Sequence, residues 1–234
     1  MRPKHDRDGL KVVDSPAQQG YKQPVNVLSI SDVIVPSIYA PGLRERYPHV
    51  DFVLACGDLP YYYQEFIISS LDVPLFFVRG NHDPEIEYGE GGNRTHPHGG
   101  IDLHRRVLDY RGVLLAGVEG SERYKPQGRY QYTQAEMWGH VWALTPLLMY
   151  NRLRTGRYLD VFISHAPPWG IHDKDDRVHR GIKAFRWLLS VFKPRYHFHG
   201  HIHVYSPNTV TKTRFEGTWV INTYGYRETQ LELP

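Results

Sequence analysis

Three short apolar runs in the first third of the chain each end at small or polar residues. They cover residues 25–30, 51–56 and 73–79 and are rich in Val, Leu, Ile and Phe. Runs of this length bounded by Gly, Asp or Asn are typical of buried strands. Because residues 61–71, between the second and third runs, are compatible with a helix, the pattern favours βαβ units and a parallel sheet.

The rest of the chain alternates less regularly. Residues 84–104 are rich in Gly and Pro and are expected to form a long loop. Thr133 opens a capping box before apolar residues at helical spacing, which predicts a helix that kinks or restarts at Pro146. Two strands over 113–118 and 159–164 and an amphipathic helix over 182–192 are expected. Four short β-like stretches indicate an antiparallel tail over 196–199, 202–205, 209–213 and 217–222.

The chain of 234 residues is 41 % hydrophobic and 13 % aromatic, which is enough to bury a sizeable core. Layered α/β domains of roughly 200–250 residues are common. We therefore expect one domain over residues 25–234, preceded by a polar N-terminal extension over residues 1–24.

Charge and cysteine content narrow the classes of partner. The chain has 28 Lys+Arg against 25 Asp+Glu, a net charge of +3, and the basic residues are dispersed. This argues against nucleic acid as a partner, except as a nucleotide or short oligonucleotide substrate. No apolar run approaches the roughly 18 residues needed to span a bilayer, so no membrane partner is expected. The single cysteine, Cys56, excludes an intrachain disulfide, and no secretory signal pattern is visible, which favours a cytoplasmic protein.

Side chains with metal-binding chemistry follow the predicted strands. They come directly after the carboxyl ends of four strands and are Asp32, Asp58, Asn81, His82 and His165. Because the loops at the carboxyl ends of parallel strands converge, we expect these side chains to lie close together. Carboxylate, amide and imidazole groups suit divalent ions such as Mn, Fe or Zn.

A histidine-rich stretch over residues 197–203 adds further imidazoles. On an extended backbone, residues i and i+2 face the same side, so His201 and His203 can point to one centre. Gly200 lets the backbone approach closely there. The alternative is a row of histidines that face solvent on an edge strand.

The order and spacing of these motifs resemble those of the calcineurin-like metallophosphoesterases. The family pattern is D-x-H, G-D-x-x-D/N, G-N-H-D/E, a lone His and G-H-x-H. The corresponding residues here are Asp32, Gly57-Asp58, Gly80-Asn81-His82-Asp83, His165 and Gly200-His201-Ile202-His203. The resemblance spans residues 25 to about 225 and implies an α/β fold, a four-layer α/β/β/α sandwich of two mixed β-sheets.

The resemblance also implies a function and a set of roles. The protein would be a metallophosphoesterase, a hydrolase that cleaves a phosphate monoester or diester in a small phosphorylated substrate. It would use two divalent ions such as Mn, Fe, Zn or Ni, which activate the attacking water. The implied ligands are Asp32 and His203 in one site, Asn81, His165 and His201 in the other, and Asp58 between the two ions. His82, which is not a ligand in the family, would be the general acid.

Two positions depart from the family pattern. Ile34 stands where the first motif has a histidine, so the first site would lack a ligand and the chain could bind only one ion. Tyr61 replaces the acid of the second motif and could hydrogen-bond His82 only through its hydroxyl. A catalytically impaired family member that acts as a protein-interaction scaffold is therefore the alternative.

Three residues outside the motifs each have two interpretations. Arg123 follows a predicted strand, where it would either clamp a phosphate or lie in solvent. His172 and His179 lie in the loop after His165 and are either contacts of the site, to a ligand residue or to the substrate, or exposed loop residues.

Overall fold

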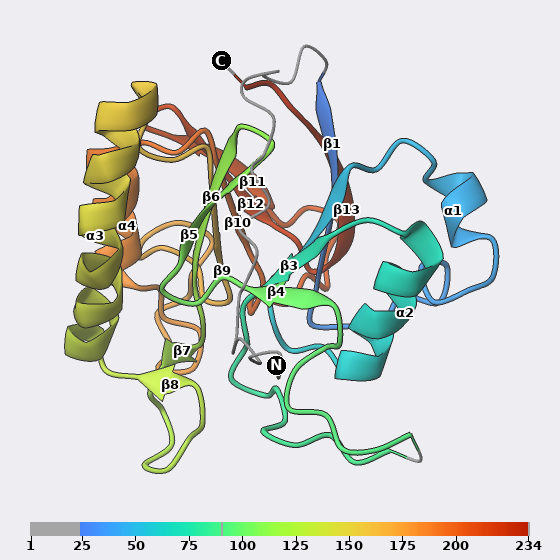
Figure 1. Cartoon of the computed structure of the whole chain (residues 1–234). Helices are drawn as coiled ribbons and strands as arrows, with labels where there is room; N and C mark the ends of the chain where they lie inside the picture. Colours follow the sequence, from blue (N-terminus) through green and yellow to red (C-terminus); the bar gives the residue numbers. More distant parts are fainter. Residues whose placement is uncertain (1–23, 90, 234) are drawn as a thin grey trace, which may run out of the picture.

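Two β-sheets pack face to face, and helices cover the outer face of each (Figure 1). The computed structural model describes residues 24–89 and 91–233, so the expected polar extension over 1–24 lies outside the described residues apart from Pro24. Two sheets between two helical layers make the four-layer α/β/β/α sandwich. The fold implied by the resemblance is therefore confirmed.

The first sheet has five strands, of which four are parallel. Its spatial order is β4 (Gly100–Asp102), β3 (Leu75–Phe77), β2 (Phe52–Ala55), β1 (Val25–Ser31) and β13 (Gly225–Leu231). β1 to β4 run parallel, as the apolar runs predict for the first three, and β13 runs antiparallel to β1. The outer face is covered by α1 (Leu43–Arg46) and α2 (Tyr61–Leu71) (Figure 1).

The second sheet has six strands, with four parallel strands in the middle. Its spatial order is β5 (Val107–Tyr110), β6 (Val113–Val118), β9 (Val161–Ser164), β10 (Tyr196–His199), β12 (Thr218–Asn222) and β11 (Lys212–Phe215). The edge strands β5 and β11 are antiparallel to their neighbours. The outer face is covered by α3 (Gln134–Thr155) and α4 (Lys183–Phe192). A separate two-stranded sheet is formed by β7 (Ser121–Glu122) and β8 (Gln131–Tyr132).

The apolar core has three parts, one in each space between the layers. Between the sheets, Phe52 and Phe76 pack edge to face with ring centroids 5.6 Å apart, in one cluster with Phe198 of the opposite sheet. A second cluster joins α3 and α4 to their sheet, and a third joins α1 and α2 to theirs. Because the parallel strands are buried on both faces, they are near-continuous apolar runs in the sequence.

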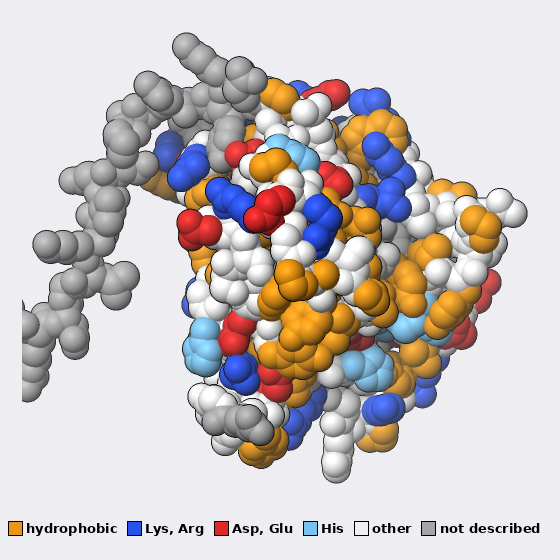
Figure 2. Space-filling view, turned by 90° about the vertical axis from the view of Figure 1, so that its right-hand side faces the viewer, with side chains coloured by type: hydrophobic (Ala, Val, Ile, Leu, Met, Phe, Trp, Pro, Cys, Tyr) orange, Lys and Arg blue, Asp and Glu red, His pale blue; other side chains and the backbone are white. Residues whose placement is uncertain are grey.

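Aromatic side chains extend the third cluster to the surface. Tyr39 packs edge to face on Tyr62 and Phe66, with ring centroids 5.9 and 4.7 Å apart. Figure 2 faces this side of the molecule and shows hydrophobic side chains gathered among charged ones. Packing among the rings covers part of the apolar surface that the helices leave unburied.

The longest helix, α3, begins where the sequence predicts and continues through Pro146. The Thr133 hydroxyl accepts the N–H of Glu136, and the Glu136 carboxylate accepts the N–H of Thr133, which completes the capping box. The helix does not restart at Pro146, which lies on the exposed face, where water can bind the carbonyl that the proline leaves without a donor. Among residues 24–89 and 91–233, no helix is long and apolar enough to cross a bilayer.

The C-terminal tail is not the antiparallel unit that was expected. β10 and β12 pair in parallel, because the chain between them crosses to the sheet edge and forms β11. The expected strand over 202–205 is a loop, since a left-handed turn at His201 follows the end of β10. Antiparallel pairing in the tail is confined to β11 with β12 and to β13 with β1.

Among the described residues, five strands lie where none was predicted, namely β4, β5, β7, β8 and β13. β4 falls within the segment expected as a loop over 84–104, and β13 follows the last predicted strand. β13 is buried only at its two ends, with polar or partly exposed side chains between them. An edge strand that is open to solvent needs no apolar run, so the hydrophobic pattern alone does not reveal it.

Removal of the capping hydroxyl tests how far the first turn of α3 contributes to stability. We expect Thr133→Ala to lower the free energy of unfolding by about 1 kcal/mol, because the N–H of Glu136 loses its acceptor. The control is Thr145→Ala within the same helix, where the hydroxyl bonds only the Val141 carbonyl and we expect a change below about 0.5 kcal/mol. Urea denaturation measures both variants, and equal losses would contradict a specific role for the cap.

Candidate metal centre

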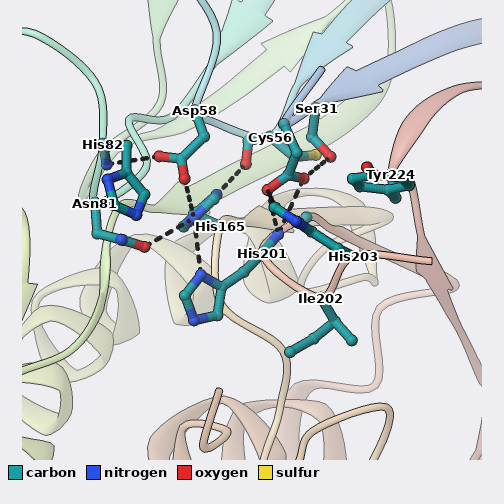
Figure 3. Close-up of polar contacts among 12 residues, drawn as sticks. Ser31, Cys56, Asp58, Asn81, His82, His165, His201, Ile202, His203 and Tyr224 are labelled. Atoms are coloured by element: carbon teal, nitrogen blue, oxygen red, sulfur yellow. Dashed lines mark hydrogen bonds and ion pairs between the residues drawn. The ribbon is translucent and has the colours of Figure 1, made fainter. Parts of the chain in front are cut away.

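Side chains from strand ends meet at one end of the sandwich, and Figure 3 labels Asp58, Asn81, His165, His201 and His203 among them. They are Asp32 after β1, Asp58 after β2, Asn81 after β3, His165 after β9, and His201 and His203 after β10. Three of these strands belong to the first sheet and two to the second, so the centre bridges the two sheets. The structure brings together all six residues that the resemblance implies as metal ligands.

Three electron-pair donors surround the Nε2 atom of His165. The Asn81 Oδ1, His201 Nδ1 and Asp58 Oδ2 atoms lie 3.0, 3.2 and 3.3 Å from it. His165 is fully buried, and Asn81 and His201 are 7 % and 5 % exposed. Water therefore has little access to these donor atoms.

Hydrogen bonds on the far side of each imidazole decide which nitrogen carries the proton. His165 Nδ1 lies 2.8 Å from the Cys56 carbonyl oxygen, and His201 Nε2 lies 2.7 Å from that of Val178. A carbonyl can only accept, so both of these nitrogens are donors. In the neutral rings, His165 Nε2 and His201 Nδ1 then carry no proton, and their lone pairs face each other. Donation of the remote N–H to a backbone carbonyl is the usual way in which a protein orients a metal-ligating histidine.

The chemistry of this donor set fits a divalent cation. Two imidazole lone pairs, an amide oxygen and a carboxylate oxygen repel one another at these distances unless positive charge lies among them. Although burial of the His165 ring favours its neutral form, the neighbouring Asp58 carboxylate raises the pKa of His165 to about 9. The cluster thus attracts positive charge, and its mixed nitrogen and oxygen ligands suit Mn, Fe, Zn or Ni.

Asp58 and the neighbouring Asp83 have pKa values that are shifted in opposite directions. Although burial opposes ionisation, His165 and the backbone N–H of His82 lower the pKa of Asp58 to about 2. The His82 N–H donates to Asp58 Oδ1 at 2.7 Å, so Oδ2 is left facing His165. Burial and the charge on Asp58 raise the pKa of the neighbouring Asp83 to about 7. The Asp83 carboxyl accepts two backbone N–H groups and so ties the loop after β3 to the loop after β2.

Asp32 and His203 form the more open half of the centre. The Asp32 carboxylate accepts the backbone N–H of His201 at 3.0 and 3.1 Å. His203 Nε2 lies 3.6 Å from Asp32 Oδ1, its side chain is 41 % exposed, and the contact with Asp32 raises its pKa. Ligand atoms of Asp32, Asp58 and His165 lie within 4.8 Å of one another, so the two halves are continuous.

Three of the candidate ligands lie in left-handed turns close behind their strands. The φ angles of Asp32, Asp58 and His201 are 65, 57 and 67°. Each such turn costs on the order of 1 kcal/mol and turns the side chain away from the alternation of the strand. The expectation that His201 and His203 share one face of an extended strand is wrong, because β10 ends at His199 and the turn at His201 brings both rings to the centre.

Two motif glycines permit the close approach of neighbouring loops. A Cβ atom on Gly80 would overlap Asp58 Oδ1, and one on Gly200 would lie 2.5 Å from Asp32 Oδ2. Backbone hydrogen bonds fix both carboxylates. Any side chain at either position would displace a candidate ligand, which explains the glycine in both motifs.

Tyr124 is a site residue that the sequence analysis did not identify. Its hydroxyl accepts from Asn81 Nδ2 at 3.1 Å and lies 3.4 Å from His82 Nε2. The first of these contacts turns the Asn81 oxygen toward the centre. Its neighbour Arg123 binds Glu136 and a backbone carbonyl instead, so it does not clamp a phosphate in this structure. The sequence offered only one signal for Tyr124, its place shortly after the predicted strand over 113–118.

The two departures from the family pattern have different structural roles. Tyr61 is buried at the start of α2, and its hydroxyl donates to the Pro84 carbonyl at 2.6 Å. It therefore does not bond His82, which has Tyr124 as its neighbour. Ile34 packs against the apolar cluster under α2 and offers no ligand atom.

A family profile and two solved structures resemble this chain. The profile of the calcineurin-like phosphoesterase family matches residues 26–205. One crystal structure is 16 % identical, with a TM-score of 0.60, and the alignment covers 89 % of this chain and 95 % of that one. The crystal structure of TT1561 from Thermus thermophilus is 15 % identical, with a TM-score of 0.56, and the alignment covers 87 % of this chain and 90 % of that one. At these identities the two structures support the fold alone. No curated protein matches the chain in sequence.

Thermal unfolding with and without Mn²⁺ tests whether the donors bind a cation. An ion present at 100 times its dissociation constant stabilises a protein by about 2.7 kcal/mol, which raises the Tm of a chain of this size by roughly 5–10 °C. We expect this rise in the native chain and its loss in Asp58→Asn, which keeps the acceptor for the His82 N–H but removes the charge. Asp72→Asn, at the end of α2, is the control and should retain the full rise. An equal rise in both variants would contradict the assignment.

Proposed function

The chain belongs to the calcineurin-like phosphoesterase family, and we propose that it is a phosphoric ester hydrolase acting on a monoester or diester. The family implies metal-dependent hydrolysis of phosphoesters. One observation supports this activity most directly in this chain: Asn81, His201 and Asp58 place donor atoms within 3.3 Å of the buried Nε2 of His165.

The centre offers two adjoining positions for divalent ions. One would be held by Asn81, His165, His201 and Asp58, and the other by Asp32, His203 and Asp58. Ions bound there supply Lewis-acid chemistry, which polarises phosphoryl oxygens and lowers the pKa of the attacking water. Ile34 contributes no donor, so the position beside Asp32 relies on fewer ligands than the position beside His165. Mn, Fe, Zn and Ni all accept this donor set.

His82 is placed to give a proton to the leaving group. Its backbone N–H is fixed to Asp58 at 2.7 Å, whereas its ring is exposed beside the centre. A protonated imidazole in this position can donate to the ester oxygen as its bond to phosphorus breaks. The Tyr124 hydroxyl, 3.4 Å from His82 Nε2, offers the ring an uncharged partner in place of the acid of the family motif.

A small phosphorylated molecule is the substrate that we propose. His82 is exposed and His203 is partly exposed on the solvent side of the centre, so a small ester can reach it. Nucleotides and short oligonucleotides belong to this class, because the centre would bind their phosphate groups. A cytoplasmic location, favoured by the single buried thiol of Cys56, belongs to the same proposal.

A protein-interaction scaffold is the second candidate, and Ile34 is the observation that favours it. Its side chain packs into an apolar cluster, which removes one ligand from the position beside Asp32. The complete donor set around His165 favours the enzyme instead, since a scaffold needs neither this set nor an exposed His82. A phosphoesterase that uses a single ion together with His82 lies between the two.

Hydrolysis of bis(p-nitrophenyl) phosphate in the presence of Mn²⁺ tests the role of His82. We expect His82→Ala to lower kcat by about 10²–10⁴-fold, because the leaving oxygen loses its proton donor. Metal content should not change, since His82 is not a ligand. The control is His49→Ala, an exposed histidine that pairs with Glu228 elsewhere on the surface and should leave kcat unchanged.

Two results would overturn the proposal in different ways. Full activity of the native chain in excess chelator would exclude the metal-dependent reaction. Metal binding without turnover of monoester and diester substrates alike would make the scaffold the better account.

A further inference from the structure

A cavity of about 510 Å³ lies beside the open half of the metal centre. The loop after β9 and the loop after β10 form most of its walls, and these two loops also carry His165 and His203. Its volume lies within the roughly 300–1,000 Å³ of typical small-molecule sites. The residues that line it include Ile171, His172, Ile202, His203, Tyr205 and Val210.

His203 connects the cavity to the candidate metal centre. Its ring lines the cavity, while its Nε2 atom lies 3.6 Å from Asp32 Oδ1. Its Nδ1 atom lies 2.8 Å from the hydroxyl of Tyr205, which is 81 % exposed. The Tyr224 ring lies 4.9 Å from that of His203 and 6.3 Å from that of Tyr205. A phosphate at the centre would thus have an aromatic rim on the side where the cavity begins.

The imidazole of His172 in the cavity wall is already bonded to the protein on both sides. His199 Nδ1 donates to the Gly200 carbonyl, so His199 Nε2 accepts from His172 Nδ1 at 2.9 Å. His172 Nε2 then accepts the Thr213 hydroxyl at 2.9 Å. Burial lowers the pKa of His172 to about 4, so the ring is uncharged at neutral pH. Neither of its nitrogens is left to bind a ligand.

The rest of the lining combines an apolar wall with two charged side chains and the hydroxyls of Ser206 and Thr209. Ile171 and Ile202 are 7 % and 3 % exposed, and Val210 borders the open side. Asp173 and Lys174 are the charged side chains of the described lining, and one Asp173 carboxylate oxygen accepts the backbone N–H of Gly181. The hydroxyls of a sugar or other polyol that face Ile171, Ile202 and Val210 would lose hydrogen bonds to water without replacing them. An aromatic ring makes few hydrogen bonds to water and would lose few of them there.

We propose that this cavity binds the organic group of the substrate as an aromatic or heteroaromatic ring, while the phosphate lies at the metal centre. The inference rests on the proposed function and narrows the substrate class to phosphate esters that carry a ring. Apolar contact with Ile171, Ile202 and Val210 and stacking near Tyr205 would supply the preference.

Two monoesters that differ in their organic group test this preference. We expect the Mn²⁺-loaded protein to have a KM about tenfold or more lower for 1-naphthyl phosphate than for glycerol 2-phosphate. Val210→Trp places a large side chain at the cavity, and since Val210 is 64 % exposed the core should fold unchanged. This variant should raise the KM for the naphthyl ester about tenfold and leave that for the glycerol ester within about twofold. Thr209→Trp, from the same lining, should act in the same direction.

The matched control is Val191→Trp, which adds the same bulk at an exposed valine of α4 away from the cavity lining. It should leave both KM values unchanged. Equal KM values for the two esters in the native chain, or an equal rise for both esters in Val210→Trp, would overturn the inference.

Equilibrium dialysis of 1-naphthyl phosphate separates this inference from the proposed function. If the native chain binds the ester without hydrolysing it and Val210→Trp weakens the binding about tenfold, the cavity assignment stands and the hydrolase proposal fails. If the native chain hydrolyses both esters with no preference, the hydrolase proposal stands and the cavity assignment fails. Absence of both binding and turnover would overturn the two together.

Discussion

The crowding of electron-pair donors around His165 Nε2 is the constraint on which the rest of the site depends. Asp58, Asn81 and His201 approach this atom from three different loops. Backbone carbonyls hold the N–H groups of both imidazoles on their far sides, so no proton of a neutral ring lies between them. Water cannot screen the resulting repulsion in a buried position. The cluster therefore needs a positive charge, which a second proton on His165, whose pKa is raised to about 9, or a bound metal ion can supply.

The architecture supplies what such a cluster requires. Parallel strands from both sheets end at the same edge of the sandwich, which places candidate ligands from distant parts of the sequence in one volume. Gly80 and Gly200 let loops approach to distances that no side chain would permit. Left-handed turns at Asp32 and Asp58 direct the carboxylates inward at a local conformational cost. The three apolar clusters, which lie between the layers, stabilise the strands whose ends carry this strain.

Much of this arrangement could be predicted from the sequence, and the omissions have physical causes. Strands buried on both faces are apolar runs, and the polar residues at their ends identified the side chains that meet. The hydrophobic pattern did not predict β13, because this edge strand is buried only at its two ends. Tyr124 reaches the centre only through the path of the loop between β7 and β8, and Tyr61 bonds Pro84 for similarly non-local reasons. The turn at His201 was missed because alternation in sequence does not distinguish a strand from a left-handed loop.

The most direct test of this account is the metal content of the chain, measured by elemental analysis of protein purified without a histidine tag and dialysed against Mn²⁺. The account predicts at least one equivalent of manganese per native chain and its loss in Asn81→Ala, which removes one donor from the buried cluster. A native chain that retains no manganese, or an Asn81→Ala variant that retains as much as the native chain, would contradict the claim that these donors hold a cation.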